Sequence, residues 1–146
     1  MKPIVLLDAI NSVDKRDYLR KDYRLLKMLK EDLGRYNHFI LTSTTKKDLY
    51  KTLDLLGIPL DFFTLILTFD DLTCLKPHPN AFKRILDFTK DLPETHVLVG
   101  DNERMDIIPS KKVGMKTIMV WNESDIADFN VESIYDVSKI IQILND

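Results

Sequence analysis

Cysteine and long apolar stretches are scarce in this chain of 146 residues. Its one cysteine, Cys74, cannot form a disulfide within the chain, and such sparing use is typical of a reducing compartment. Near the first residue only four consecutive apolar side chains, Ile4–Leu7, precede the charged Asp8. That is too few for the core of a signal peptide or for a membrane span. The sequence therefore predicts a cytoplasmic protein with no membrane as a partner.

The chain also lacks an excess of charge of one sign. Its 21 Lys and Arg residues stand against 23 Asp and Glu, mixed along the sequence, for a formal net charge of −2. Proteins that hold nucleic acid by its phosphates carry a basic surface, so nucleic acid is not an expected partner. No internal repeat, low-complexity segment or linker divides the chain. We expect one domain over residues 1–146.

The sequence does contain a series of short apolar runs separated by helical patterns. The runs lie at residues 4–7, 39–41, 62–69, 96–99 and 117–121, and the helical patterns at 14–33, 45–56, 81–90, 106–113 and 131–144. Unbroken apolar runs are typical of strands buried on both faces, and their alternation with helices predicts βαβ crossovers. The expected fold is α/β, with three layers around a doubly wound, parallel, five-stranded sheet.

Polar residues follow most of these apolar runs, at the edge of the sheet where open α/β folds bind ligands. They are Asp8, Thr42 with Ser43, the loop residue Lys76, Asp101, and Asp106 five residues further on. Carboxylates are good ligands for Mg²⁺, whereas ammonium and hydroxyl groups bind phosphoryl oxygens. Each residue alone could equally serve as a cap, a turn or a solvated charge. Together, and in this order, they indicate a site for a divalent cation and a phosphate.

The order of these residues resembles the four motifs of the haloacid dehalogenase-like (HAD) hydrolase superfamily. The strongest match is KPHPNAF (Lys76–Phe82) followed by VLVGDNERMDIIPSKKVGMKTIMV (Val97–Val120), and FILTS is a weaker second motif. The resemblance covers nearly the whole chain. It implies the HAD-like Rossmannoid core, a phosphatase-type hydrolysis and Mg²⁺ as cofactor.

The resemblance also implies a role for each polar residue. Asp8 matches the nucleophile that forms an aspartyl-phosphate. Thr42 matches the hydroxyl that binds the transferring phosphoryl group, with Ser43 offering a neighbouring backbone donor. Lys76 matches the cation that neutralises Asp8 and the phosphoryl oxygens.

The implied metal ligands are two further carboxylates and a backbone oxygen, together with Asp8. Asp101 matches the direct ligand of Mg²⁺, and Asp106 the carboxylate that supports the metal or its waters. In the superfamily the backbone carbonyl at the position of Ile10 also binds the metal. The cation would screen the charge that keeps an anionic nucleophile from a phosphate.

Ile10 is the main departure from the superfamily's pattern. Phosphatases read DxDxT or DxDxV in the first motif, and the second Asp is the general acid and base, whereas this chain reads DAINS. An alkyl side chain cannot transfer a proton, and general acid–base catalysis contributes ~10²–10⁴-fold. We therefore expect slow turnover, with metal binding preserved because the backbone carbonyl is kept.

The connections between the motifs are short. Only 33 residues separate Asp8 from Thr42, and another 33 separate Thr42 from Lys76. Predicted helices and strands fill both intervals, so neither has room for a cap domain. The expected open site suits a phosphorylated small molecule, a phosphoprotein, or closure by a second copy of the chain in a homo-oligomer.

Three other functions compete with a phosphatase. The replacement at Ile10 favours a catalytically impaired HAD fold that binds a phosphorylated ligand or a protein partner. A dehalogenase also lacks the second Asp, but a capless site would not desolvate a small haloacid. A receiver domain shares the residue types in a different order along the chain, because its acidic pair comes early.

The histidines and the cysteine are weaker candidates for catalytic residues. His38 and His96 begin predicted strands, at the end of the sheet away from the site, and are expected to be structural. His78 lies in the same loop as Lys76 and is most simply polar surface. Nothing in the sequence marks Cys74 as a nucleophile.

Overall fold

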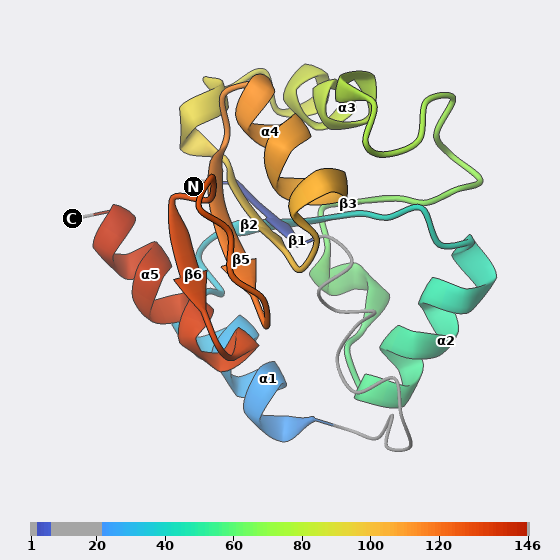
Figure 1. Ribbon diagram of the computed structural model, residues 1–146. Coiled ribbons are helices and arrows are strands. Elements are labelled where there is room, and N and C mark those ends of the chain that lie inside the picture. Colours follow the sequence, from blue (N-terminus) through green and yellow to red (C-terminus); the bar gives the residue numbers. More distant parts are fainter. Residues whose placement is uncertain (1–2, 7–21, 146) are drawn as a thin grey trace.

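The computed structural model of the chain describes residues 3–6 and 22–145. One parallel sheet runs through this part of the chain, with the strands in the order β3-β2-β1-β4-β5-β6 (Figure 1). The strands are β1 Pro3–Leu6, β2 Asn37–Leu41, β3 Leu65–Leu67, β4 Val97–Gly100, β5 Lys116–Val120 and β6 Phe129–Val131. The strand order reverses direction between β1 and β4, which is where doubly wound folds place a ligand crevice.

Helices cover both faces of the sheet (Figure 1). They are α1 Tyr23–Lys27, α2 Lys46–Leu56, α3 Pro79–Thr89, α4 Ile108–Lys112 and α5 Val137–Leu144, with π-helical turns at Met28–Asp32 and Glu103–Ile107. Side chains of α1, α2 and α5 share one apolar core with the sheet, and side chains of α3 share a second core on the opposite face. The predicted three-layer, doubly wound α/β fold is confirmed.

Strands β2 and β4 are buried on both faces, as their unbroken apolar character predicts. Along β4, Val97 and Val99 belong to the core under α1, α2 and α5, whereas Leu98 belongs to the core under α3. Along β2, Ile40 and Phe39 divide between the two cores in the same way. Alternate residues of one strand therefore stabilise two separate helical layers.

A sixth strand, β6, joins the five that the sequence predicts. It consists of the three residues FNV and pairs with β5 through Ile118↔Phe129 and Val120↔Val131. So short a segment, with a central Asn, gives no apolar run. The helix predicted over residues 131–144 begins only at Val137, because Val131 belongs to β6 and Ile134–Asp136 form a turn of 3₁₀ helix. The predicted run 62–69 forms a strand only at its centre, because Leu60–Phe62 make a turn of 3₁₀ helix.

Capping groups set the helix boundaries. Thr45 begins α2 by accepting a hydrogen bond from the Asp48 N–H at 3.3 Å, and Gly57 ends it with a φ of 80°, a conformation that suits glycine. The predicted helix at 14–33 is described only from Asp22, whose carboxylate accepts from the Leu25 N–H. No helix in the described ranges is long and apolar enough to cross a bilayer.

His38 and His96 lie at the amino ends of β2 and β4 and are both buried. His38 Nε2 donates to the Leu33 carbonyl at 2.8 Å, while its buried Nδ1 has no hydrogen-bond partner in the described chain. A second proton would have to sit on that enclosed Nδ1. Burial lowers the pKa of His38 from 6.5, although the bond to Leu33 opposes the shift, and burial likewise lowers the pKa of His96.

We expect the free energy of unfolding to decrease as the pH falls below about 6.5. There the unfolded chain binds protons that the folded chain, with its lowered histidine pKa values, does not. Chemical denaturation between pH 8 and pH 5 measures this dependence. His38→Gln keeps an N–H donor but does not titrate, so its stability should fall less steeply with acid. An equal slope in both proteins would contradict this account of His38.

Candidate active site

The carboxyl ends of the central strands bring together residues that are far apart in sequence. The β1 residue Leu6 pairs with Ile40 on one side and with Val99 on the other. Thr42 and Asp101 each lie two residues beyond those partners. Because β1 lies between β2 and β4, the backbones at Thr42 and Asp101 are separated by two strand spacings, which is roughly 10 Å. The predicted site residues Asp8 and Ile10 lie outside the described residues.

A buried ion pair links two of the predicted site residues. Lys76 Nζ lies 2.8 Å from Asp106 Oδ1, and the two side chains are 0% and 1% exposed. The pair joins the loop after β3 to the π-helical turn after β4, 30 residues further along the chain. Because isolated buried charges are very costly, each of these groups needs its partner. The sequence pattern placed both residues at this edge but did not predict that they would bind each other.

Gly100 and Asn102 position the Asp106 carboxylate. A Cβ on Gly100 would lie 2.7 Å from Asp106 Oδ2 and equally close to Asp106 Cβ, so no larger residue fits there unless the backbone shifts. The Asn102 N–H donates to Asp106 Oδ2 at 3.3 Å, and the Asn102 side chain accepts from the Met105 N–H at 2.9 Å. Asn102 thus begins the turn that points Asp106 back toward the end of β4.

Asp101 directly follows β4 and is partly exposed. No described residue forms a hydrogen bond or an ion pair with its carboxylate, whereas its backbone carbonyl accepts from Asn122 Nδ2 at 2.9 Å. Asn122 was not among the predicted site residues. It could have been identified from the sequence, because it comes directly after the apolar run 117–121 and so at the same edge of the sheet.

Thr42 and Ser43 follow β2 at this edge. Thr42 is fully buried, and its N–H extends the pairing of β2 with β3 by donating to the Leu67 carbonyl at 3.0 Å. Thr42 Oγ1 accepts from the Thr44 N–H at 3.1 Å. Ser43 Oγ is buried with no hydrogen-bond partner in the described ranges. A buried hydroxyl of this kind calls for a partner that the described chain does not supply.

The donor set at this edge fits a hard divalent cation. Asp101 and Asp106 supply carboxylate oxygens, which Mg²⁺ prefers, and the enclosed ion pair adds no soft ligand. Residues 3–6 and 22–145 contain no group of three or more His, Cys, Asp or Glu side chains that could hold a metal. The described chain thus provides two of the predicted ligands, and the others, Asp8 and the Ile10 carbonyl, belong to the segment that is not described.

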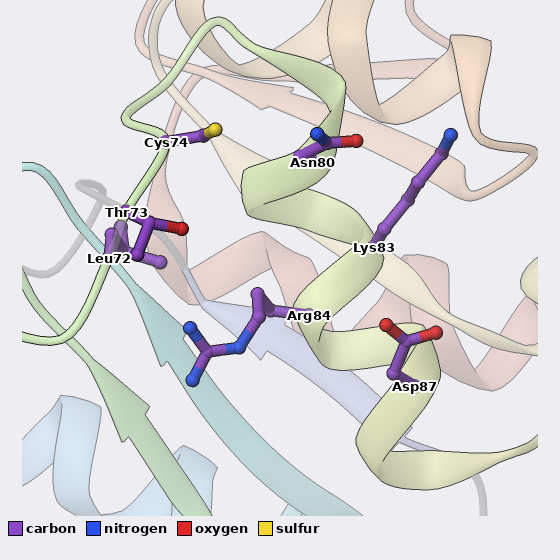
Figure 2. Close-up of a pocket in the computed structure, with 7 residues that line it drawn as sticks. All are labelled: Leu72, Thr73, Cys74, Asn80, Lys83, Arg84 and Asp87. Carbon is purple, nitrogen blue, oxygen red and sulfur yellow. The ribbon is translucent and has the colours of Figure 1, made fainter.

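A hollow of about 200 Å³ lies beside the same loop but is separate from this constellation. Its lining side chains are Leu72, Thr73, Cys74, Asn80, Lys83, Arg84 and Asp87, from the loop and from α3 (Figure 2). Arg84 donates to the Asp71 carbonyl at 3.3 Å. None of the predicted catalytic or metal-binding residues lines this hollow, and most of its polar side chains are exposed. We therefore do not assign it to the site.

Comparison with known proteins relates the chain to one family of hydrolases. Residues 6–120 match a family model described as haloacid dehalogenase-like hydrolase. Pyrophosphatase PpaX from Bacillus cereus (strain B4264) is 29% identical over 141 residues, covering 90% of this chain and 65% of the relative. The chain thus spans slightly less than two thirds of the length of the curated relatives it matches.

Two solved structures show the same fold. A HAD phosphatase from Thermococcus onnurineus superposes with a TM-score of 0.68 at 29% identity, over 80% of this chain and 54% of that one. An uncharacterized protein from Listeria monocytogenes serotype 4b superposes with a TM-score of 0.71 at 19% identity, over 99% of both chains. At so low an identity the second likeness concerns the fold alone.

We expect Lys76→Met to destabilise the protein by about 3–5 kcal/mol, because it removes the ammonium group that faces the buried Asp106 carboxylate. Urea unfolding at neutral pH measures the loss. Lys46→Met is the matched control, since Lys46 lies 3.6 Å from Asp71 in an exposed pair whose removal costs about 0–1 kcal/mol. Equal losses in the two variants would contradict the conclusion that each buried group of this pair needs the other.

Proposed function

The chain belongs to the haloacid dehalogenase-like hydrolase family, and we propose that it is a Mg²⁺-dependent phosphatase that acts through Asp8. The buried pair of Lys76 and Asp106 beside Asp101 is the observation that carries the proposal. With Asp101, which directly follows β4, the pair provides one ammonium and two carboxylates on the connections that follow β3 and β4. That combination suits a phosphoryl group and a cation better than it suits an uncharged substrate.

The chemical step in this proposal is a displacement at phosphorus. A carboxylate oxygen of Asp8 forms a bond to phosphorus while the bond to the leaving oxygen breaks, and water later hydrolyses the aspartyl-phosphate to regenerate Asp8. The pairing of β1 supports this assignment, because Thr42 and Asp101 follow the two strands that pair with β1. Thr42 is the proposed hydroxyl donor to the phosphoryl oxygens, with Ser43 beside it.

Lys76 provides the positive charge for the anionic groups in this proposal. Its side chain is fully buried, and a charge withdrawn from water interacts more strongly with its neighbours. Asp106 holds the ammonium at a fixed place, so little reorganisation is needed when a phosphoryl group binds. The same ion pair that joins the two connections thereby preorganises the site.

Asp101 and Asp106, with Asp8 and the backbone carbonyl of Ile10, are the proposed ligands of Mg²⁺. Once bound, the cation would screen the repulsion between a carboxylate nucleophile and an anionic phosphate. The carboxylate of Asp101 is partly exposed and has no hydrogen-bond or ion-pair partner among the described residues, which supports its assignment as the direct ligand. The buried Asp106, held by Lys76 and Asn102, suits the supporting role.

The relatives suggest which substrates to try first. Those that match over most of this chain are named pyrophosphatase PpaX, so inorganic pyrophosphate belongs beside phosphate monoesters in the first substrate panel. Short connections between the motifs favour an open site that also admits a phosphoprotein or a second copy of the chain. We propose these as substrate and partner classes.

A second candidate function follows from Ile10. Without an acid to protonate the leaving oxygen, the protein would bind Mg²⁺ and phosphorylated ligands and release product very slowly. It would then act as a binding module for a phosphorylated ligand or protein. The phosphatase and the binding module would both bind Mg²⁺ and a phosphorylated molecule, and they differ only in the rate of turnover.

The primary test is hydrolysis of pyrophosphate and of an aryl phosphate by the purified protein with Mg²⁺. Asp8→Asn should lower the rate on the order of 10⁴-fold, as expected for removal of a nucleophile. The matched control is Asp61→Asn, at an exposed carboxylate before β3, which should leave the rate unchanged. Turnover that survives in Asp8→Asn, or that does not respond to EDTA, would contradict the proposal.

The variant Ile10→Asp separates the two candidates. It restores a proton donor at the missing position, so we expect kcat to rise by ~10²–10⁴-fold. Ile143→Asp, at an exposed position of α5, controls for an added carboxylate. If Ile10→Asp turns over no faster than the unmodified chain, the absent acid is not what limits catalysis.

A further inference from the structure

The connection between β5 and β6 is held against the loop that carries Asp101. It begins at Trp121, whose φ of 63° is rare for a bulky residue. The Trp121 N–H donates to the Val131 carbonyl at 3.1 Å, which continues the pairing of β5 with β6. An unfavourable backbone conformation persists where surrounding contacts fix it, and such positions cluster near functional sites.

Directly after this bend, Asn122 Nδ2 donates to the Asp101 carbonyl at 2.9 Å. The bond crosses from the end of β5 to the end of β4, between residues that are 21 positions apart. It holds the backbone of Asp101 and does not involve the carboxylate. Asn122 itself is exposed, so this single bond contributes little to global stability.

A second tie joins the same two loops. The buried Ser124 donates from Oγ to Glu103 Oε2 at 2.5 Å. Asn130 on β6 fixes Ser124 from both sides, since its side chain accepts from the Ser124 N–H at 2.8 Å and donates to the Ser124 carbonyl at 3.0 Å. The residues on either side of Asn102 are therefore both attached to the β5–β6 connection.

The far end of the connection is anchored by Asp128. Its Oδ2 accepts from the Thr117 N–H at 2.8 Å and from Thr117 Oγ1 at 3.1 Å, and its Oδ1 lies 3.1 Å from Lys111 Nζ. Partial burial opposes ionisation, but the hydrogen bonds from Lys111 and Thr117 hold the pKa of Asp128 below its ordinary value. The anchor is thus ionised at neutral pH.

We propose that Asn122 is a positioning residue that presents the Asp101 carboxylate to Mg²⁺. The inference rests on the proposed function, because it concerns the metal that Asp101 is proposed to bind. Asp101 sits on a short turn and has no side-chain partner of its own in the described chain, so its direction depends on its backbone. Groups that orient a metal ligand typically change metal affinity 10–100-fold when they are removed. Because the hydrogen bond between Ser124 and Glu103 still holds the loop, we expect the loss of Mg²⁺ affinity on removing Asn122 to lie at the lower end of that range.

Mg²⁺ titration by isothermal calorimetry, with no substrate present, tests the role of Asn122. Asn122→Ala should weaken Mg²⁺ binding about 10-fold, and Asn122→Gln, which keeps an amide donor, should recover part of the loss. Asn80→Ala, at an exposed asparagine on α3, should bind as the unmodified chain does. The metal-free melting temperature should be the same in all of these proteins.

Hydrogen exchange of the metal-free protein gives a second readout. The backbone amides of residues 101–103 should exchange faster in Asn122→Ala than in Asn80→Ala, because the tie to the Asp101 carbonyl is lost. If the unmodified chain binds Mg²⁺ and Asn122→Ala binds it equally well, the inference about Asn122 is overturned and the proposed function stands. If the unmodified chain binds no Mg²⁺, both are overturned.

Discussion

The buried ion pair between Lys76 and Asp106 is the constraint on which the carboxyl edge of the sheet depends. A charge with no access to water has to be met by a partner at close range, and here the partners come from two different loops. Gly100 must lack a side chain so that Asp106 can pack against it, and Asn102 must begin the turn that brings Asp106 back. The need to pair these two buried charges thus explains the glycine at position 100, the start of the helical turn at Asn102 and the position of the loop before α3.

The sheet order explains why these residues meet. Because β1 lies between β2 and β4, the residues that follow its two neighbours face each other across the point where the chain reverses its direction of winding. Thr42 and Asp101 occupy those two places. The β5–β6 connection then supports the same edge from the side, through Asn122. Membership in the haloacid dehalogenase-like hydrolase family agrees with a site built at this position.

Much of the fold was predictable because strands such as β2 and β4 are buried on both faces and therefore appear as apolar runs, as with Val97–Val99. β6 was missed because three residues with a central Asn leave no such run. Thr42, Asp101 and Asp106 were identified from their spacing after strands, and the structure places all three at that edge. Their partners were not predictable in this way. The bond from Asn122 to Asp101 follows a backbone bend at Trp121, and no local sequence pattern predicts that bend. The close contact between Gly100 and the Asp106 side chain is visible only in the three-dimensional structure.

The central claim is that Asp8 and Asp101 share one cation at this edge and that Asp8 accepts the phosphoryl group. A crystal structure of the protein soaked with Mg²⁺ and BeF₃⁻ tests it most directly. The account predicts beryllium bonded to an Asp8 carboxylate oxygen, with its fluorides near Lys76 and Thr42, and Mg²⁺ between Asp8 and Asp101 at distances of about 2.0–2.1 Å from its oxygen ligands. Carboxylates of Asp8 and Asp101 more than about 8 Å apart, too far to meet on one ion at such distances, would contradict it.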